Sequence, residues 1–427
     1  MIRKLFRHAC ITTPVDRGRP LSGRDQGQVA TVKKGALLSE NGDIAAMGEE
    51  KKILAGLSSR DVDLEVDCGG RCLIPGFVDP HTHLCFARTR EEEFRLRMAG
   101  ETYLGILKRG GGILASVQAV REAGEPDLFQ MTRRHALSAL GSGTTTLEIK
   151  SGYGLDTETE LKMLRVIARV DRETPLRVVP TFLGAHAVPP AFKADPDGYV
   201  ELVIRKMIPA VAEQGIARFC DVFCEEGAFS LIQSRRILRA AQEAGLALKI
   251  HADEVHDLGG AGLAAELRAV SADHLLAAGE ANLRAMAEKG VLGVLLPATA
   301  YSLRKPYAPA RRLVETAVPL ALATDGNPGS SYTESMPFVF GLAVVQMHLT
   351  PEEALVAATL NGAYALKEAD RAGSLDPGKR ADFILLDGES PAALAYHAGT
   401  APIAAVYKKG ERMPQNPASH KAGGHPS

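Results

Sequence analysis

The sequence has few of the features that mark membrane, secreted or nucleic-acid-binding proteins. No apolar run approaches the roughly 18–20 residues of a membrane span, and the opening residues MIRKLFRHACITT lack the apolar core and cleavage site of a signal peptide. The 50 Lys and Arg residues balance 51 Asp and Glu residues, which gives no support for binding to nucleic acid or to an anionic membrane surface. We therefore expect a cytoplasmic protein with no nucleic-acid partner and no membrane association.

Two common cofactor motifs are also absent. None of the six cysteines belongs to a C-x-x-C pair, which argues against a zinc ribbon or a thioredoxin-like redox site. Several of them lie in apolar, strand-like runs, where a reduced and buried thiol is the expected state. No G-x-G-x-x-G follows a first strand, and this weakens the case for a dinucleotide-binding fold.

The middle of the chain alternates β-rich runs with helical patterns. Residues 158–170 (ETELKMLRVIARV) and 230–245 (SLIQSRRILRAAQEAG) have the apolar spacing of amphipathic helices. Alternating strands and helices predict a parallel α/β sheet, and eight such units favour a closed (β/α)8 TIM-like barrel over an open doubly wound sheet. The eight predicted strands are RCLIPGFVD, TTTLEIK, LRVVPTFLGAH, RFCDVFCEEG, LALKIHADE, VSADHLL, LGVLLPAT and PLALATD.

The two ends of the chain predict β-structure of a different kind. Short β-type runs separated by polar turns precede the barrel pattern, and two more, RADFILLDG and PIAAVYKKGE, lie near the C-terminus. We infer one small β-sandwich-like domain built from residues 1–69 and 370–412, with the barrel, residues 70–369, inserted between them. Residues 16–30 are expected to form a mobile loop and residues 413–427 a flexible tail.

The most informative motif is the pair His81 and His83 at the end of the run CLIPGFVDPHTH. Residues two apart on a strand point to the same face, but an isolated H-x-H fits two hydrogen-bonded core histidines as well as half of a metal site. The metal interpretation gains weight because five of the 12 histidines fall at predicted strand ends, where barrel enzymes hold their active sites. The polar residues at these ends are His81, His83, Glu148, Lys150, Tyr153, His186, Glu225, Glu226, His251, Asp253, Glu254, Asp273, His274 and Asp325.

Three imidazoles and one carboxylate form a ligand set suited to Zn²⁺ or to another borderline metal such as Fe²⁺. We assign His81, His83, His251 and Asp325 to this set, which leaves one position for a water whose pKa the metal would lower toward about 7. A bridged pair of metals needs a further group, typically a modified lysine at the end of the fourth strand, and that end reads CEEG. We therefore expect one Zn²⁺ or Fe ion per chain, with Lys150 as an outer contact or a cation for the substrate.

This metal set resembles that of the amidohydrolase superfamily, and the longer runs resemble its imidazolonepropionase family. The matching runs are PGFVDPHTHLCFARTREEEF, GGGILASV, TTTLEIKSGYGLD, TFLGAHAVP, DVFCEEGAF, KIHADEV, SADHLL and LATDGNPGSS, spread over nearly the whole chain. The resemblance implies metal-dependent hydrolysis of the lactam of 4-imidazolone-5-propanoate to N-formimidoyl-L-glutamate in histidine degradation. A homodimer is a further expectation from the family.

The resemblance also implies residue roles. The catalytic residues are expected to be His274, Asp325 and Glu254, and the role of Glu254 stays open between shuttling a proton and binding the ring. The expected substrate contacts are Arg90, Tyr103, Tyr153, His186, Glu254, Asn327, Gly329 and Ser330. Backbone N–H groups of the 327–330 turn suit an anion. One departure from the family pattern is Gly326, where many members carry a large residue, and its missing side chain is expected to loosen the wall beside Asp325.

Other interpretations remain open at this stage. Arg90 also fits an ordinary surface-helix pair with Glu93, three residues on. The nearest enzymatic alternatives are a related deaminase and a cyclic-amide hydrolase acting on another small heterocycle. A barrel scaffold without activity is the alternative from a different class, and the retention of all four predicted ligands argues against it.

Overall fold

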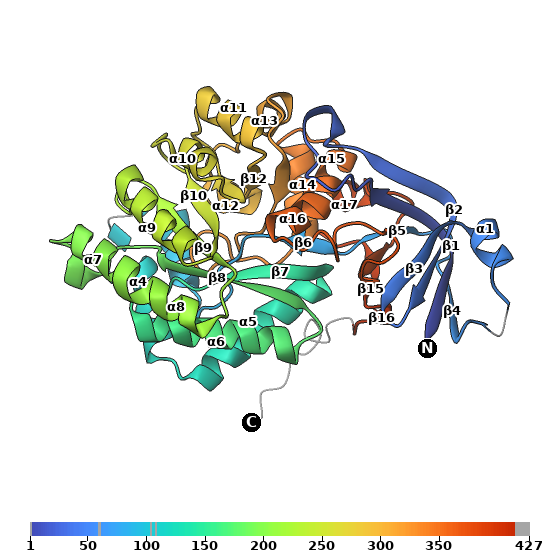
Figure 1. Cartoon of the computed structure of the whole chain (residues 1–427), viewed down its shortest axis with the longest axis horizontal. Coiled ribbons are helices and arrows are strands. Elements are labelled where there is room, and N and C mark those ends of the chain that lie inside the picture. The colour runs from blue at the N-terminus through green and yellow to red at the C-terminus, as the bar shows by residue number, and fades with distance from the viewer. Residues whose placement is uncertain (1, 59–60, 103–104, 107–108, 415–427) are drawn as a thin grey trace.

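The computed structural model describes residues 2–58, 61–102, 105–106 and 109–414. It consists of a barrel surrounded by helices and a second sheet beside it, at the right of Figure 1. The predicted substrate contact Tyr103 and residues 415–427 of the predicted tail lie outside the described residues.

The strands of the barrel follow one another around the sheet in sequence order. In the described part of the chain they form an eight-stranded sheet in which all neighbours are parallel. Their bounds are β6 (Phe77–Asp79), β7 (Thr144–Lys150), β8 (Arg177–Ala185), β9 (Phe219–Cys224), β10 (Ala247–Ala252), β11 (Ser271–His274), β12 (Leu292–Leu295) and β13 (Leu320–Leu322).

The barrel closes directly beside the predicted ligands. Thr82, just after β6, bridges in parallel to Gly326, just after β13. The Asp325 N–H donates to the His81 carbonyl at 3.0 Å, and the His83 N–H donates to the Gly326 carbonyl at 2.9 Å. The predicted TIM-like barrel is therefore confirmed, and its seam brings His81 and His83 next to Asp325.

Helices cover the outside of the barrel (Figure 1). The helix predicted over residues 158–170 is confirmed as α6 (Thr157–Glu173), which begins at the N-cap Asp156 and buries Met163, Ile167 and Val170. None of the helices in the described residues is long and apolar enough to cross a membrane. The other helices are α1 (Glu50–Ala55), α2 (Glu91–Met98), α4 (Ile113–Glu122), α5 (Glu125–Gly141), α7 (Pro196–Leu202), α8 (Ile208–Gln214), α9 (Leu231–Glu243), α10 (Gly260–Leu267), α11 (Glu280–Lys289), α12 (Pro297–Leu303), α13 (Ala310–Glu315), α14 (Met336–Val345), α15 (Pro351–Ala358), α16 (Leu360–Ala365) and α17 (Ala393–Tyr396).

The second sheet joins both ends of the chain, as predicted. It has mixed strand directions and the order β16-β15-β14-β5-β1-β2-β3, with β4 paired to β1. Phe6, Phe383 and Tyr407 pack at its centre with ring centroids 4.7–5.0 Å apart. The strands are β1 (Arg3–Pro14), β2 (Val29–Glu40), β3 (Asp43–Glu49), β4 (Leu64–Asp67), β5 (Cys72–Pro75), β14 (Phe383–Leu386), β15 (Ile403–Lys408) and β16 (Glu411–Arg412).

The run RCLIPGFVD, predicted as one barrel strand, is divided between the two sheets. β5 pairs with β1 and β14 of the terminal sheet, whereas β6 pairs with β7 of the barrel. Gly76 separates them, and a Cβ there would lie 2.4 Å from the Thr145 side chain, so only glycine allows this close approach. Sheet membership changes at Gly76, while the domain boundary at residues 69 and 70 stays a prediction.

The stretch predicted as a mobile loop is packed against the barrel. The Leu21 N–H donates to Asn361 Oδ1 at 2.9 Å, and Leu21 is fully buried. Gln26, also fully buried, accepts from the Leu320 N–H at 3.0 Å and donates to the Leu320 carbonyl at 3.2 Å. The prediction of a mobile loop is therefore wrong, because Leu21 and Gln26 are buried and Gln26 forms hydrogen bonds with the backbone of Leu320 at the start of β13.

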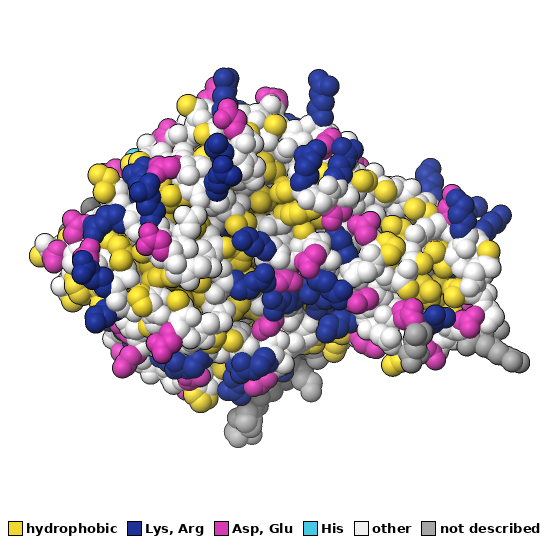
Figure 2. Space-filling model, viewed as in Figure 1, with side chains coloured by type: hydrophobic (Ala, Val, Ile, Leu, Met, Phe, Trp, Pro, Cys, Tyr) yellow, Lys and Arg dark blue, Asp and Glu magenta, His cyan; other side chains and the backbone are white. Residues whose placement is uncertain are grey.

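Charged side chains of both signs are interspersed over the face shown in Figure 2. This distribution agrees with the balanced charge of the sequence, which has 50 basic and 51 acidic residues.

Candidate active site

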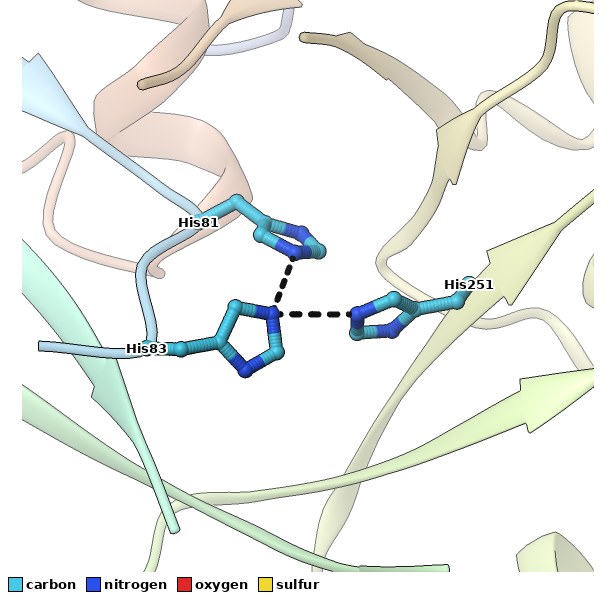
Figure 3. A group of neighbouring side chains, drawn as sticks. All are labelled: His81, His83 and His251. Carbon is cyan, nitrogen blue, oxygen red and sulfur yellow. Dashed lines mark hydrogen bonds between the residues drawn. The ribbon is translucent and has the colours of Figure 1, made fainter. Parts of the chain in front are cut away.

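Three histidines from two strand ends converge in the barrel (Figure 3). His81 Nε2 lies 3.2 Å from His83 Nε2, and His251 Nε2 lies 3.3 Å from the same His83 atom. All three side chains are buried, with at most 3% exposed. The predicted pairing of the H-x-H motif with a histidine on the fifth barrel strand is therefore present in the structure.

Asp325 lies next to two of the three histidines, outside the His81, His83 and His251 group whose ligand atoms all lie within 4.8 Å of one another. Its Oδ1 lies 3.6 Å from His81 Nε2 and 3.4 Å from His83 Nε2, while its Oδ2 accepts from the Thr299 hydroxyl at 2.6 Å. Ligand atoms held about 2.0–2.1 Å from one tetrahedral zinc ion lie roughly 3.3 Å apart, which is close to these separations. These separations fit a metal ion. The sequence did not predict the role of Thr299, which belongs to the run LLPAT where no ligand was expected.

Carboxylates hold the outer nitrogens of two of these imidazoles. His81 Nδ1 donates to Asp273 Oδ2 at 2.5 Å, and His251 Nδ1 lies 3.0 Å from Asp221 Oδ2. A proton on each Nδ1 leaves the Nε2 lone pair pointing toward the other imidazoles. In the structure His83 Nε2 lies within hydrogen-bonding distance of both other Nε2 atoms, and a bound cation would take the place of the shared protons. This arrangement suits a metal site.

Two buried lysines, Lys150 and Lys249, lie near these histidines and carboxylates. Lys150 Nζ is 2.8 Å from Asp221 and 2.7 Å from Glu148, and Lys249 Nζ donates to the Pro80 carbonyl at 2.7 Å. Burial disfavours the charged form of Lys150, but Asp221 and Glu148 outweigh it and raise the pKa. Lys150 is therefore an outer contact of the metal site, because it does not line the cavity that a substrate would enter.

The protonation states follow from this arrangement. Burial and the nearby Lys150 hold the pKa of His81 well below its usual range, and burial lowers the pKa of His83. For His251 burial acts the same way, but the Asp221 carboxylate outweighs it and raises the pKa. Although burial opposes ionisation of Asp325, its contact with His83 lowers the pKa to about 2. His81 and His83 thus favour the neutral form and Asp325 the ionised form, as metal ligands require, whereas the raised pKa of His251 means that it has to release a proton when a metal binds.

The backbone is unusual at the same strand ends. Asp253, His274, Leu275 and Asp325 have positive φ angles of 51°, 79°, 60° and 53°. Non-glycine residues rarely adopt this left-handed conformation, which costs free energy and often occurs at functional sites. The Asp253 carboxylate stabilises its turn by accepting from the N–H groups of Gly260 and Ala261, both at 2.9 Å. This turn carries the neighbouring Glu254.

A cavity of about 550 Å³ opens above the histidines. At one side, His274 Nε2 lies 3.7 Å from Glu254 Oε2. His81 does not line the cavity, because it lies deeper in the barrel. The predicted site residues that line it are His83, Arg90, Tyr153, His186, His251, Glu254, His274, Asp325, Asn327, Gly329 and Ser330.

Arg90 combines both interpretations that the sequence left open. It forms the helix pair with Glu93, whose carboxylate accepts from Arg90 Nε at 2.8 Å and Nη2 at 2.6 Å. Both side chains are only about one-sixth exposed and both line the cavity. A Cβ on Gly329 would lie 2.4 Å from Arg90 Nη1, so the glycine makes room for the guanidinium.

The turn after Asp325 is closed by its own asparagine. Asn327 Oδ1 accepts from the N–H groups of Gly329 and Ser330 at 2.8 and 2.7 Å, and its Nδ2 donates to the Asp325 carbonyl at 2.6 Å. The expectation that these N–H groups bind an anion is wrong for this conformation, because their hydrogen bonds are already made.

No gap surrounds Gly326. A Cβ at this position would lie 2.8 Å from Leu84 Cδ2 and 2.9 Å from the Thr333 carbonyl oxygen. The expected loosening beside Asp325 is therefore absent, because the Leu84 side chain and the Thr333 backbone fill the space that a larger residue would need.

His186 and Tyr153 form one wall of the cavity. His186 stacks on His83 with ring centroids 4.9 Å apart, and its Nδ1 donates to the Gly152 carbonyl at 3.0 Å. Burial holds the pKa of His186 well below its usual range, so its neutral ring presents an Nε2 lone pair rather than a proton. The Tyr153 hydroxyl makes no hydrogen bond within the described residues and is free to contact a ligand.

Comparison with known proteins identifies the family. The model of the amidohydrolase family matches residues 72–413. Curated imidazolonepropionases are similar over almost the whole chain: that of Syntrophobacter fumaroxidans is 65% identical, covering 97% of this chain and 98% of its own length. That of Desulfotalea psychrophila is 61% identical, covering 97% of this chain and 100% of its own. The chain belongs to the imidazolonepropionase family of amidohydrolases. The resemblance predicted from the sequence motifs is confirmed.

Solved amidohydrolase-type structures share the architecture at low identity. A guanine deaminase from Bradyrhizobium japonicum superposes with a TM-score of 0.72 at 19% identity, covering 97% of this chain and 100% of its own. A zinc-bound adenosine deaminase from Xanthomonas campestris gives 0.69 at 20% identity, covering 96% and 92%. At this identity the likeness supports the barrel with its added sheet, and it says nothing about the substrate.

Proposed function

We propose that this cavity hydrolyses the lactam ring of 4-imidazolone-5-propanoate to N-formimidoyl-L-glutamate, a step of histidine degradation. The observation that carries the proposal is the His81, His83, His251 and Asp325 cluster. His83, His251 and Asp325 line the floor of a cavity with a guanidinium in its wall, and His81 lies beneath them. Relatives 44–65% identical to this chain are imidazolonepropionases. The buried floor is suited to activating water for attack on the cyclic amide, and the cationic wall is suited to binding the anionic tail of this substrate.

The same four residues would hold one Zn²⁺ or Fe ion per chain. Such an ion supplies a Lewis acid that activates water for attack on an amide carbonyl. A single ion is favoured because Glu225 and Glu226 follow the fourth barrel strand, β9, where a bridging lysine would be needed for two. Glu225 is committed to structure: its carboxylate accepts from the Val255 N–H at 2.9 Å and pairs with His256 Nδ1 at 2.8 Å.

Proton transfer falls to three residues around the cavity floor. Hydrolysis breaks the ring C–N bond and forms a C–O bond, so one proton of water must reach the departing nitrogen. Asp325 and His274 are placed to accept the water's proton, and Asp325 is oriented by the Thr299 hydroxyl. Glu254, beside His274, is placed to hold the ring N–H and to deliver a proton to the nitrogen.

Recognition of the substrate uses the walls. The His186 Nε2 lone pair suits a ring N–H, and the free Tyr153 hydroxyl suits either the ring or the propanoate. Arg90 suits the propanoate, because a guanidinium matches a carboxylate and this one already lies at the cavity edge. Tyr103 is proposed as a further contact from the family motif alone.

The proposal is tested by following the ultraviolet absorbance of freshly prepared 4-imidazolone-5-propanoate under anaerobic conditions. Wild-type protein is compared with His83→Ala, and the product is identified as N-formimidoyl-L-glutamate. Loss of absorbance with the wild type alone supports the proposal. No loss with metal-loaded wild type would overturn it, and ammonia release from a panel of aminated rings would then indicate a deaminase.

A further inference from the structure

Arg97, in the last turn of α2, is a partly buried cation of the cavity wall that has no role in the proposed mechanism. Its Nη1 donates to the Gly329 carbonyl at 3.2 Å and its Nη2 to the Ser302 hydroxyl at 3.4 Å, both neutral acceptors. Its Nε is buried without a hydrogen-bond partner in the described residues. Burial and the neighbouring Arg90 lower its pKa, so the guanidinium lies in an unfavourable environment for a cation.

The other charges of this wall are mostly compensated. Arg90 is paired with Glu93, and Glu101 lies 3.0 Å from Arg109. Among the described residues, Arg97 and Lys305 are the cavity-lining cations with no carboxylate within 4.0 Å, and Lys305 is exposed at its rim. The described part of the inner wall therefore has one guanidinium with no directly paired carboxylate, and a substrate anion can take that place.

Gly329 links the two guanidiniums. Its carbonyl accepts from Arg97, and its Cα lies against Arg90 Nη1, where a Cβ would be only 2.4 Å away. An anion beside Gly329 therefore faces both cations. The Gly329 and Ser330 N–H groups cannot hold it, because Asn327 accepts from both of them.

We propose that Arg97 is a specificity-determining residue, which selects the carboxylate tail of the substrate together with Arg90. The identity of this carboxylate tail rests on the proposed function. That the site binds an anion follows from the two guanidiniums alone. Arg90 shares its Nε and Nη2 with Glu93, so Arg97 contributes the cation that has no directly paired carboxylate among the described residues.

The test compares two stable ligands of similar shape with a charged and a neutral tail, imidazole-4-propanoate and imidazole-4-propanamide, as competitive inhibitors. Arg97→Met should weaken inhibition by the propanoate about tenfold or more, since charge-assisted contacts are lost, and should change inhibition by the amide by less than about twofold. The KM for the substrate should rise by a similar factor, with a smaller change in kcat.

Arg95→Met is the matched control. Arg95 lies on the same helix, is 68% exposed and pairs with Glu92, so its loss should leave both inhibition constants unchanged. Arg97→Gln keeps a donor for the Gly329 carbonyl without the charge, and it should resemble Arg97→Met if charge decides selectivity. Thermal melts of each variant separate a folding defect from a binding defect.

Equal changes for the propanoate and the amide, or no change for either, would overturn the inference. Failure of the wild type to open the imidazolone ring while it still prefers the propanoate would overturn the proposed function and leave the role of Arg97 standing. Ring opening by the wild type together with unchanged selectivity in Arg97→Met would overturn the role of Arg97 alone.

Discussion

The floor of the cavity and its wall both carry charge, but they are built differently. In and beneath the floor, fully buried charges meet partners from the same strand or from more distant strands of the barrel: Lys150 lies between Asp221 and Glu148, and Asp273 holds His81. In the wall, Arg90 lies beside a short helix and Arg97 on it, both partly exposed. Arg97 pairs with no carboxylate in the part of the chain that the structure describes. The floor is complete in itself, whereas the wall lacks a negative charge that a ligand would bring.

This difference implies that metal binding and substrate selection are separable. Damage to the floor should cost metal affinity and stability, because an unpaired buried charge is strongly unfavourable. Damage to the wall should change which ligand binds while the metal remains. The predictions below test this separation.

The largest effect is expected for His83→Ala, which should abolish both metal binding and turnover. Removing one of three converging imidazoles leaves too few ligands for a tight site. Metal content after dialysis and the ring-opening rate measure the effect. His397→Ala is the control, because His397 is exposed and does not line the cavity, and it should retain both properties. A metal-loaded His83→Ala protein would disprove the assigned ligand set.

Asp221→Asn should weaken metal binding about 10- to 100-fold while keeping the volume of the side chain, because the carboxylate behind His251 Nδ1 is lost. It should also lower the free energy of unfolding by about 3–5 kcal/mol, since Lys150 loses a partner. Chelator competition and urea unfolding measure the two effects. Adding Lys150→Met should restore stability without restoring metal affinity; recovery of both would show that Asp221 only balances charge.

Arg90→Ala should raise KM about tenfold or more while the metal stays bound, because a charge-assisted contact to the substrate is lost from the wall. Steady-state kinetics and metal analysis on the same sample provide the measurement. A metal-free Arg90→Ala protein would show that wall and floor are coupled, contrary to the comparison above.

The smallest effect on function is expected for Gly326→Ala, which should lower the free energy of unfolding by about 1–3 kcal/mol without tightening substrate binding. The added methyl group would press on Leu84 and on the Thr333 carbonyl at the seam of the barrel. Urea unfolding and KM provide the check. Equal or higher stability would show that the seam has room for a side chain.

Much of the site was predictable because barrel topology gathers strand ends at one place. The spacing of His81 and His83, and the positions of His251 and Asp325 after apolar runs, were enough to propose the four ligands. Asp221 was missed although a lone carboxylate within the apolar run RFCDVFC was a usable signal of an inward-facing partner. Arg97 gave no signal, because its helix has charged residues on several sides.

Local patterns in the sequence were sufficient to determine the alternation of strands and helices and the residues that end each strand, because periodicity and residue type act over a few positions. These local patterns did not determine which distant residues contact one another. The pairing of His81 with Asp273 spans 192 residues, the change of sheet at Gly76 depends on Thr145, and the Asn327 turn consumes N–H groups that were expected to bind an anion. These outcomes depend on which distant groups meet in the folded chain, and only packing in three dimensions sets that.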